Sequence, residues 1–154
     1  MLWWYEEKIL KDFFNLILNP TSFTEVCQVR LDFESFQIDG PTATTEADGG
    51  ACVDSLVVSG SSGLSSPVIC GSNAGQHIYM EMGTQSSDTA TLAFTFAASA
   101  STTRTWEIKA TQIPCSASYR APDGCLQNHV GLTGRFQTFN FAETAIKMHL
   151  KDQK

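Results

Sequence analysis

The clearest pattern along this chain is an alternation of apolar and polar residues. From Val29 to Phe33 every second residue is apolar and the residues between are charged, and after an irregularity at Glu34 and Ser35 the run continues to Ile38. This pattern predicts a half-buried strand with a bulge near Glu34. Loops rich in Gly, Ser and Pro separate further runs at 54–59, 76–82, 92–97, 105–113 and 134–141. The spacing of short runs and turns predicts an all-β sandwich.

The N-terminal segment has a different period. Its apolar residues recur at spacings of three and four, at Leu2, Tyr5, Ile9, Phe13 and Leu16. This predicts an amphipathic helix over residues 2–18, which Pro20 ends because proline cannot continue a helix. The polar face mixes acidic residues with lysines, which argues against a membrane-surface helix, and charged residues interrupt the apolar stretch that a signal peptide needs. Either the helix covers apolar surface of the sandwich, or the segment is foreign to the module.

Composition and charge restrict the function. The chain has 154 residues, enough for one domain with short extensions, and 42% of them are hydrophobic, which is enough for a packed core. The formal net charge is −6, and only 10 residues are Lys or Arg. Nucleic-acid binding needs a basic surface, so we expect no nucleic-acid partner. The chain also lacks an apolar stretch of the length that a transmembrane helix needs.

Five cysteines lie far apart within the predicted β structure: Cys27, Cys52, Cys70, Cys115 and Cys125. None of them are in CxxC spacing, which argues against a zinc ribbon or a thioredoxin-like site. Widely spaced cysteines in β-rich sequence predict the disulfide framework of a secreted protein. The odd count leaves one cysteine without a partner in this chain, which indicates either a truncation or an intermolecular bond.

No catalytic motif accompanies these features. The sequence contains no GxSxG, HExxH, Walker or GxGxxG motif. His77 lies beside a predicted strand, where a packed or hydrogen-bonded ring is expected rather than a general base. Tyr79, Phe94 and Trp106 fall at strand spacing and are interpreted as core residues. These observations predict a protein that is not an enzyme.

Several sequence blocks occur in a specific order. They are CQVRLDF at 27–33, GACVD at 50–54, VICG at 68–71, GQHIY at 75–79, RTWEIK at 104–109, TQIPC at 111–115 and APDGCLQ at 121–127. Over roughly residues 25–141, this ordered series resembles the CUB domains of secreted arthropod proteins. The resemblance implies an extracellular CUB/spermadhesin-like jelly-roll β-sandwich, which recognises a protein or a glycan and has no enzymatic activity.

The resemblance also implies a domain organisation. Residues 1–20 are the helix that does not match the family, 21–118 are a CUB-like domain that lacks its first strands, and 119–154 are a linker and the start of a second, truncated CUB-like repeat. In this interpretation the chain is an extracellular recognition module. The alternatives are a non-catalytic appendage of a secreted hydrolase and a fragmentary gene product without independent function.

The resemblance further assigns the cysteines. It pairs Cys52 with Cys70, a bridge that closes one strand–loop–strand unit. Cys27 and Cys115 lie at the ends of two predicted strands and are the expected second bridge. Cys125 then remains as the cysteine available for an intermolecular disulfide.

Some CUB domains bind calcium through carboxylates, and Asp39 and Asp54 match the first two positions of that set. The third position falls near residues 98–102, where the sequence has no carboxylate. Calcium needs several hard oxygen ligands, so we expect no firmly held calcium and no other cofactor; a solvated Asp39 and a turn-capping Asp54 fit better. Ligand binding is expected through sandwich loops such as 40–51, 60–67 and 83–89.

Overall fold

The computed structural model describes residues 25–41, 51–60, 62, 65–83, 88–99, 101–133 and 136–140, together with the backbone of two short N-terminal strands. The strands are β1 Glu7–Leu10, β2 Asn15–Leu18, β3 Val26–Gln37, β4 Ser55–Gly60, β5 His77–Glu81, β6 Ala90–Thr95 and β7 Thr105–Pro114. This part of the chain is all-β, and it includes no helix long and apolar enough to cross a membrane.

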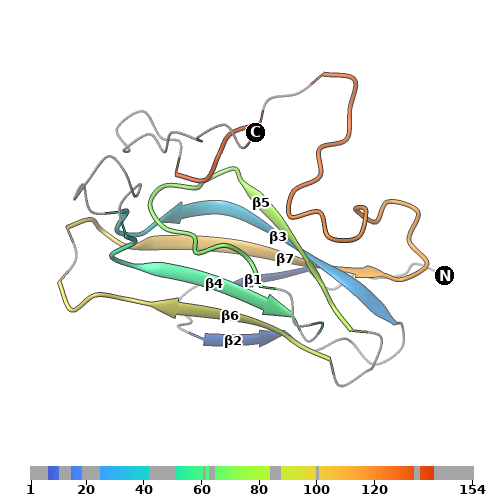
Figure 1. The fold of residues 1–154 in the computed structure, drawn as a ribbon, viewed down its shortest axis with the longest axis horizontal. Helices are drawn as coiled ribbons and strands as arrows, with labels where there is room; N and C mark the ends of the chain where they lie inside the picture. Colours follow the sequence, from blue (N-terminus) through green and yellow to red (C-terminus); the bar gives the residue numbers. More distant parts are fainter. Residues whose placement is uncertain are drawn as a thin grey trace, which may run out of the picture.

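The strands form two antiparallel sheets. The larger sheet has the order β1-β7-β3-β5 and the smaller one the order β2-β6-β4. Figure 1 shows the two sheets as layers, with β3 and β7 in one and β4 and β6 in the other. Buried side chains from both sheets belong to one apolar cluster, so the fold is a β-sandwich.

The core lies between the sheets because alternate side chains of each strand point inward. Its most deeply buried members include Leu31, Phe33, Phe36, Leu56, Val58, Ile78, Leu92 and Ile108. At one end, aromatic rings continue the core across the two sheets. The ring centroids of Phe94 on β6 and Trp106 on β7 lie 4.9 Å apart. The apolar alternation in the sequence therefore indicates which face of each strand points into this core.

Strands β3 to β7 follow the runs predicted between residues 29 and 113 closely. The bulge predicted near Glu34 is confirmed by a register shift between Phe33 and Ser35 where β3 pairs with β7. The run expected at 134–141 is different, since residues 136–140 form no strand and end in a turn at Asn140, whose φ is 59°.

The N-terminal segment contains strands where we predicted a helix. β1 pairs with β7, with Glu7 opposite Thr111, and β2 pairs with β6, with Leu18 opposite Ala90. Eight residues of the predicted helix, Glu7–Leu10 and Asn15–Leu18, lie in these strands, and the rest of segment 1–20 lies outside the described residues. Strand pairing prevails here because the edges of β6 and β7 offer backbone groups that need hydrogen-bond partners.

The chain after β7 turns back and covers the outer face of the larger sheet. Tyr79, Ile113 and Ala121 form a second buried cluster on that face, separate from the main core. The Tyr79 N–H donates to the Leu126 carbonyl at 2.8 Å, so the chain also occupies the outer edge of β5. Residues on both sides of position 119 therefore pack against the larger sheet.

Candidate functional site

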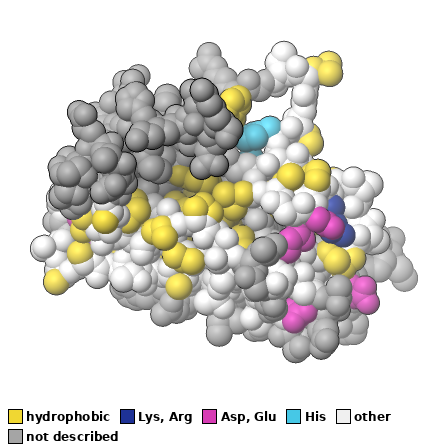
Figure 2. Space-filling model, in the orientation of Figure 1, with side chains coloured by type: hydrophobic (Ala, Val, Ile, Leu, Met, Phe, Trp, Pro, Cys, Tyr) yellow, Lys and Arg dark blue, Asp and Glu magenta, His cyan; other side chains and the backbone are white. Residues whose placement is uncertain are grey.

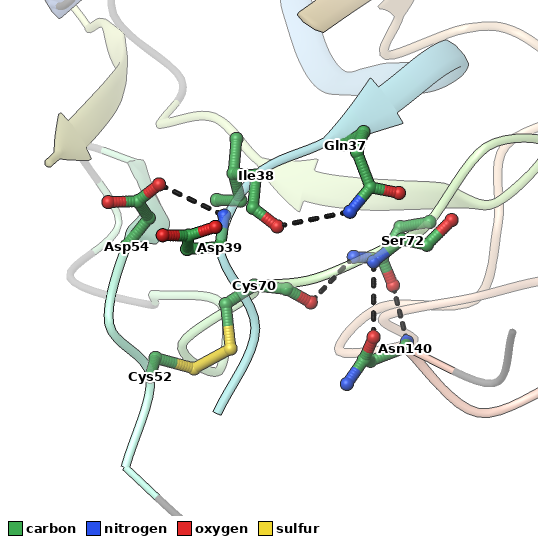
Figure 3. The surroundings of a disulfide bond; sticks show 9 residues. Gln37, Ile38, Asp39, Cys52, Asp54, Cys70, Ser72 and Asn140 are labelled. Atoms are coloured by element: carbon green, nitrogen blue, oxygen red, sulfur yellow. Dashed lines mark hydrogen bonds between the residues drawn. A yellow bond between two sulfur atoms is a disulfide. The ribbon is translucent and has the colours of Figure 1, made fainter. Parts of the chain in front are cut away.

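Two disulfides fix the ends of the strands. Cys27 at the start of β3 is bonded to Cys115 after β7, with a Cα–Cα distance of 4.7 Å, and Cys52 is bonded to Cys70, with a distance of 5.9 Å (Figure 3). The resemblance implied the Cys52–Cys70 pair, and the Cys27–Cys115 pair was expected because both cysteines lie at the ends of predicted strands. Cys125 is a free, half-buried thiol.

Asp39 and Asp54 lie together beside the Cys52–Cys70 bridge (Figure 3). An Asp54 carboxylate oxygen accepts the Asp39 backbone N–H at 2.9 Å. Both residues are buried, with 3% and 0% of their surface exposed, so the prediction of a solvated Asp39 is wrong. The Ser101 backbone N–H and hydroxyl donate to Asp39 at 2.7 and 2.9 Å, which explains how this carboxylate tolerates burial.

The positive charge of this cluster comes from Arg104, which our sequence analysis missed. Its Nε and Nη2 atoms each donate to Asp54 at 2.8 Å, in the paired geometry that suits guanidinium and carboxylate groups. Arg104 also donates to the Ala97 carbonyl at 2.8 Å. Both carboxylate oxygens of Asp54 thus accept hydrogen bonds from the Arg104 guanidinium. Among the described residues, no third Asp, Glu, His or Cys joins Asp39 and Asp54 in a metal-binding group.

Hydrogen bonding to the charged forms sets the acidity of the two carboxyl groups. The Ser101 backbone N–H lowers the pKa of Asp39 below its ordinary 3.8. Burial alone raises the pKa of Asp54, but the bonds from Arg104 and two backbone N–H groups outweigh burial and lower it. Both carboxylates are therefore ionised at neutral pH and act as fixed acceptors.

The loops that we expected to bind ligand lie largely outside the described residues. A second polar region lies on the outer face of the larger sheet. There Gln28 on β3 is fully buried, and its side-chain amide holds the backbone of Ala121 with two bonds: Nε2 donates to the Ala121 carbonyl at 2.9 Å, and Oε1 accepts its N–H at 3.0 Å. Gln28 Nε2 also donates to Glu81 at 2.6 Å. This clamp fixes the returning chain against the sheet.

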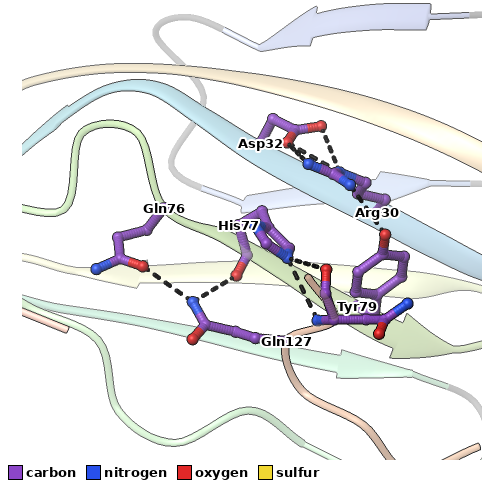
Figure 4. Close-up of polar contacts among 7 residues, drawn as sticks. Arg30, Asp32, Gln76, His77, Tyr79 and Gln127 are labelled. Atoms are coloured by element: carbon purple, nitrogen blue, oxygen red, sulfur yellow. Dashed lines mark hydrogen bonds and ion pairs between the residues drawn. The ribbon is translucent and has the colours of Figure 1, made fainter. Parts of the chain in front are cut away.

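Further along, the chain is bonded to the start of β5 (Figure 4). The Gln127 amide donates to the His77 carbonyl and to the Gln76 side chain, both at 3.0 Å. His77 Nε2 lies 3.1 Å from the Asn128 carbonyl, and the ring is almost fully buried, as a hydrogen-bonded histidine was expected to be. Burial and the nearby charge of Arg30 hold the pKa of His77 below its ordinary 6.5, so the ring is neutral at neutral pH.

Arg30 and Asp32 form an ion pair beside this histidine (Figure 4). Arg30 Nε donates to both Asp32 oxygens at 2.9 and 3.0 Å, and Nη2 donates to one of them at 2.6 Å. Arg30 Nη1 donates to the Tyr79 hydroxyl at 2.9 Å. The side chains of Arg30 and Asp32 are 34% and 30% exposed, so this pair meets solvent.

Residues 128–133, which we call the arch, leave the sheet and enclose a groove with it. The groove has a volume of about 460 Å³ and is lined by Arg30, Gly75, His77 and the arch residues Asn128, His129, Val130, Gly131, Leu132 and Thr133. The rings of His77 and His129 meet edge to face, with centroids 4.8 Å apart. In Figure 2, histidine side chains reach the surface beside apolar ones. Neither the groove nor the contact between the two histidine rings was predicted from the sequence.

Comparisons with protein families, with curated proteins and with solved structures give no match to this chain.

Proposed function

We propose that this chain is a non-catalytic, extracellular recognition module of the CUB type, which binds a protein or a glycan. The order of the sequence blocks supports the family. Two disulfides in a β-sandwich support an oxidising compartment, because such bonds persist outside the cytosol. A rigid sandwich that carries exposed loops is a common scaffold for recognition.

The exposure of the arch is the observation that carries the binding role. Val130 and Leu132 are 89% and 105% exposed, although both are apolar. Neighbouring apolar side chains held in solvent are typical of a surface that a partner covers. The arch presents them next to a groove with polar walls, and this combination suits binding rather than stability.

Both flanks of the arch are anchored, so its side chains are presented in a defined place. On one flank Gln127 and Asn128 are bonded to His77. Beyond the other flank, the Asn140 N–H donates to the Asn73 side chain at 2.6 Å. A loop fixed in this way loses less conformational entropy on binding than a free one.

The polar groups around the groove support a non-catalytic role. Among the described residues, the hydrogen-bond partner of His77 Nε2 is the Asn128 backbone and not a hydroxyl or thiol nucleophile. The Arg30 guanidinium is paired with Asp32. The described groups therefore hold the arch in position and line a binding surface.

A binding screen with matched variants tests this function. The purified, disulfide-bonded protein is applied to an array of glycans and purified extracellular-matrix proteins, and the hits are measured again with a Val130→Asp/Leu132→Asp variant. Val68→Asp is the control, because Val68 is 58% exposed and does not line the groove. Binding that only the arch variant loses supports the proposal. No binding to any array member, or equal binding by both variants, overturns it.

A further inference from the structure

We propose that the groove under the arch binds one or two units of an uncharged sugar. This inference rests on the recognition role proposed above and adds the site and the chemistry of the ligand. The size of the groove, its charge, and the mixture of polar and apolar groups in its walls all favour such a ligand.

The size of the groove suits a small ligand. Its volume of about 460 Å³ lies within the range of roughly 300–1,000 Å³ typical of sites for small molecules. One wall is the outer face of the sheet at Arg30 and His77, and the other wall is the arch. A ligand between them would contact both walls at once.

The charge of the groove argues against an anion. Among the described residues that line the groove, Arg30 is the only Lys or Arg, and Asp32 neutralises it with three hydrogen bonds. His77 is kept neutral by burial and by the same arginine. A phosphate or carboxylate would therefore compete with Asp32 for the guanidinium instead of meeting an unpaired positive charge.

The polar groups suit hydroxyl ligands. The guanidinium of Arg30 has more N–H groups than its bonds to Asp32 and Tyr79 use, and Asp32 has lone pairs beside them. Arg30 thus brings donors to one wall of the groove, and the acceptor oxygens of Asp32 lie directly beside its guanidinium. Each sugar hydroxyl can donate and accept at once, so two neighbouring hydroxyls match this arrangement. Thr133 and Asn128 add further polar groups on the arch.

The apolar part of the lining suits the C–H face of a sugar ring. His129 is exposed on the arch and its ring meets that of His77 edge to face. Val130 and Leu132 lie on either side of Gly131, whose φ of 147° is favourable mainly for glycine. These aliphatic groups are too few, among so many polar ones, to hold an acyl chain.

The experiment is an NMR titration of the ¹⁵N-labelled protein with glucose, galactose, mannose, fucose, N-acetylglucosamine and their β-linked disaccharides. Saturable shifts at Gly75, at the His129 ring and at the arch amides, with a dissociation constant of about 1 mM or tighter, are expected for at least one sugar. His129→Ala should weaken this binding about fivefold or more, and Val68→Ala should leave it unchanged. Because both residues are exposed, both variants should fold.

Three outcomes overturn the inference: no shift with any sugar, shifts that His129→Ala leaves intact, or shifts at the groove with acetate or phosphate alone. If the protein binds array members through Val130 and Leu132 but shows no NMR shifts with any sugar, the assignment of a sugar ligand is wrong and the recognition role stands. If the protein shows neither array binding nor sugar shifts, the sugar assignment and the recognition role are both wrong.

Discussion

Removing the Gln28 clamp should loosen the returning chain from the outer face of the larger sheet. In Gln28→Ala, the N–H and the carbonyl of Ala121 lose their partners in a place where Ala121 is only 2% exposed. An unsatisfied buried polar group costs roughly 1–3 kcal/mol. Two such groups at the low end, with a small term for the cavity, give a destabilisation of about 3 kcal/mol. That corresponds to a fall in Tm of roughly 6–12 °C for a domain of this size.

Gln28→Met separates the two contributions, because methionine fills the space but cannot bond to the backbone. We expect it to cost about 2 kcal/mol. The matched control is Gln37→Met, which removes one side-chain bond to the Ile38 carbonyl at 3.3 Å from a half-buried residue and should cost less than about 1 kcal/mol. Chemical denaturation followed by circular dichroism gives the free energy of unfolding for each variant.

Trypsin cleavage after Arg120 reports on the same clamp locally. In the native protein the bond between Arg120 and Ala121 is held down by Gln28, so cleavage requires local opening. Gln28→Met should speed this cleavage, and Gln37→Met should not. If Gln28→Met matched the parent protein in both stability and cleavage rate, the clamp would contribute nothing and our reasoning would be wrong.

Removal of the disulfides, acidification and thiol labelling test other parts of the structure. Replacing Cys27 and Cys115 with Ala should cost about 5 kcal/mol and replacing Cys52 and Cys70 about 3 kcal/mol, because the bridges span sequence separations of 88 and 18 residues; denaturation curves with the opposite order would contradict this. The folded-state pKa values of Asp39 and Asp54 are lowered, so the stability that they contribute is present above about pH 4 and is lost as the pH falls through those values. Tm measured between about pH 2 and 6 should therefore drop on the acid side, and the drop should be shallower in Arg104→Gln. Iodoacetamide without reductant should add a single label, at Cys125, and any covalent dimer formed under oxidation should vanish in Cys125→Ser; intact mass and non-reducing electrophoresis decide both.

The sequence predicted the structure best in segments where side chains alternate between a buried and a solvent-exposed face of a sheet. The run from Val29 to Ile38 predicted β3 together with its bulge, because burial of one face leaves only one register for the strand. The Cys52–Cys70 pair was expected from the resemblance, and the Cys27–Cys115 pair from the position of both cysteines at strand ends. The local apolar pattern thus predicted the strands and the second pair, while the order of the longer sequence blocks predicted the first pair.

Such local patterns could not predict hydrogen-bond partners that are far apart in the sequence. Gln28 looks like any solvent-facing residue of a strand, since its partner Ala121 is 93 residues away. Arg104 gave no signal either, because nothing local shows that it reaches Asp54, 50 residues earlier. In the N-terminal segment, apolar spacings of three and four suggested a helix, but pairing with the edges of β6 and β7 decided the structure.

The attachment of β1 to β7 has a consequence for the order of folding. Glu7 lies opposite Thr111, so the first strand cannot pair until almost the whole sandwich has left the ribosome. Contacts this distant in sequence form slowly, because a long loop must close before any pairing stabilises it. During that interval the edges of β7 and β6 stand open to other chains. The N-terminal strands would then be the last to pair with the sheets. Refolding at high protein concentration should therefore favour aggregates that start at these two edges.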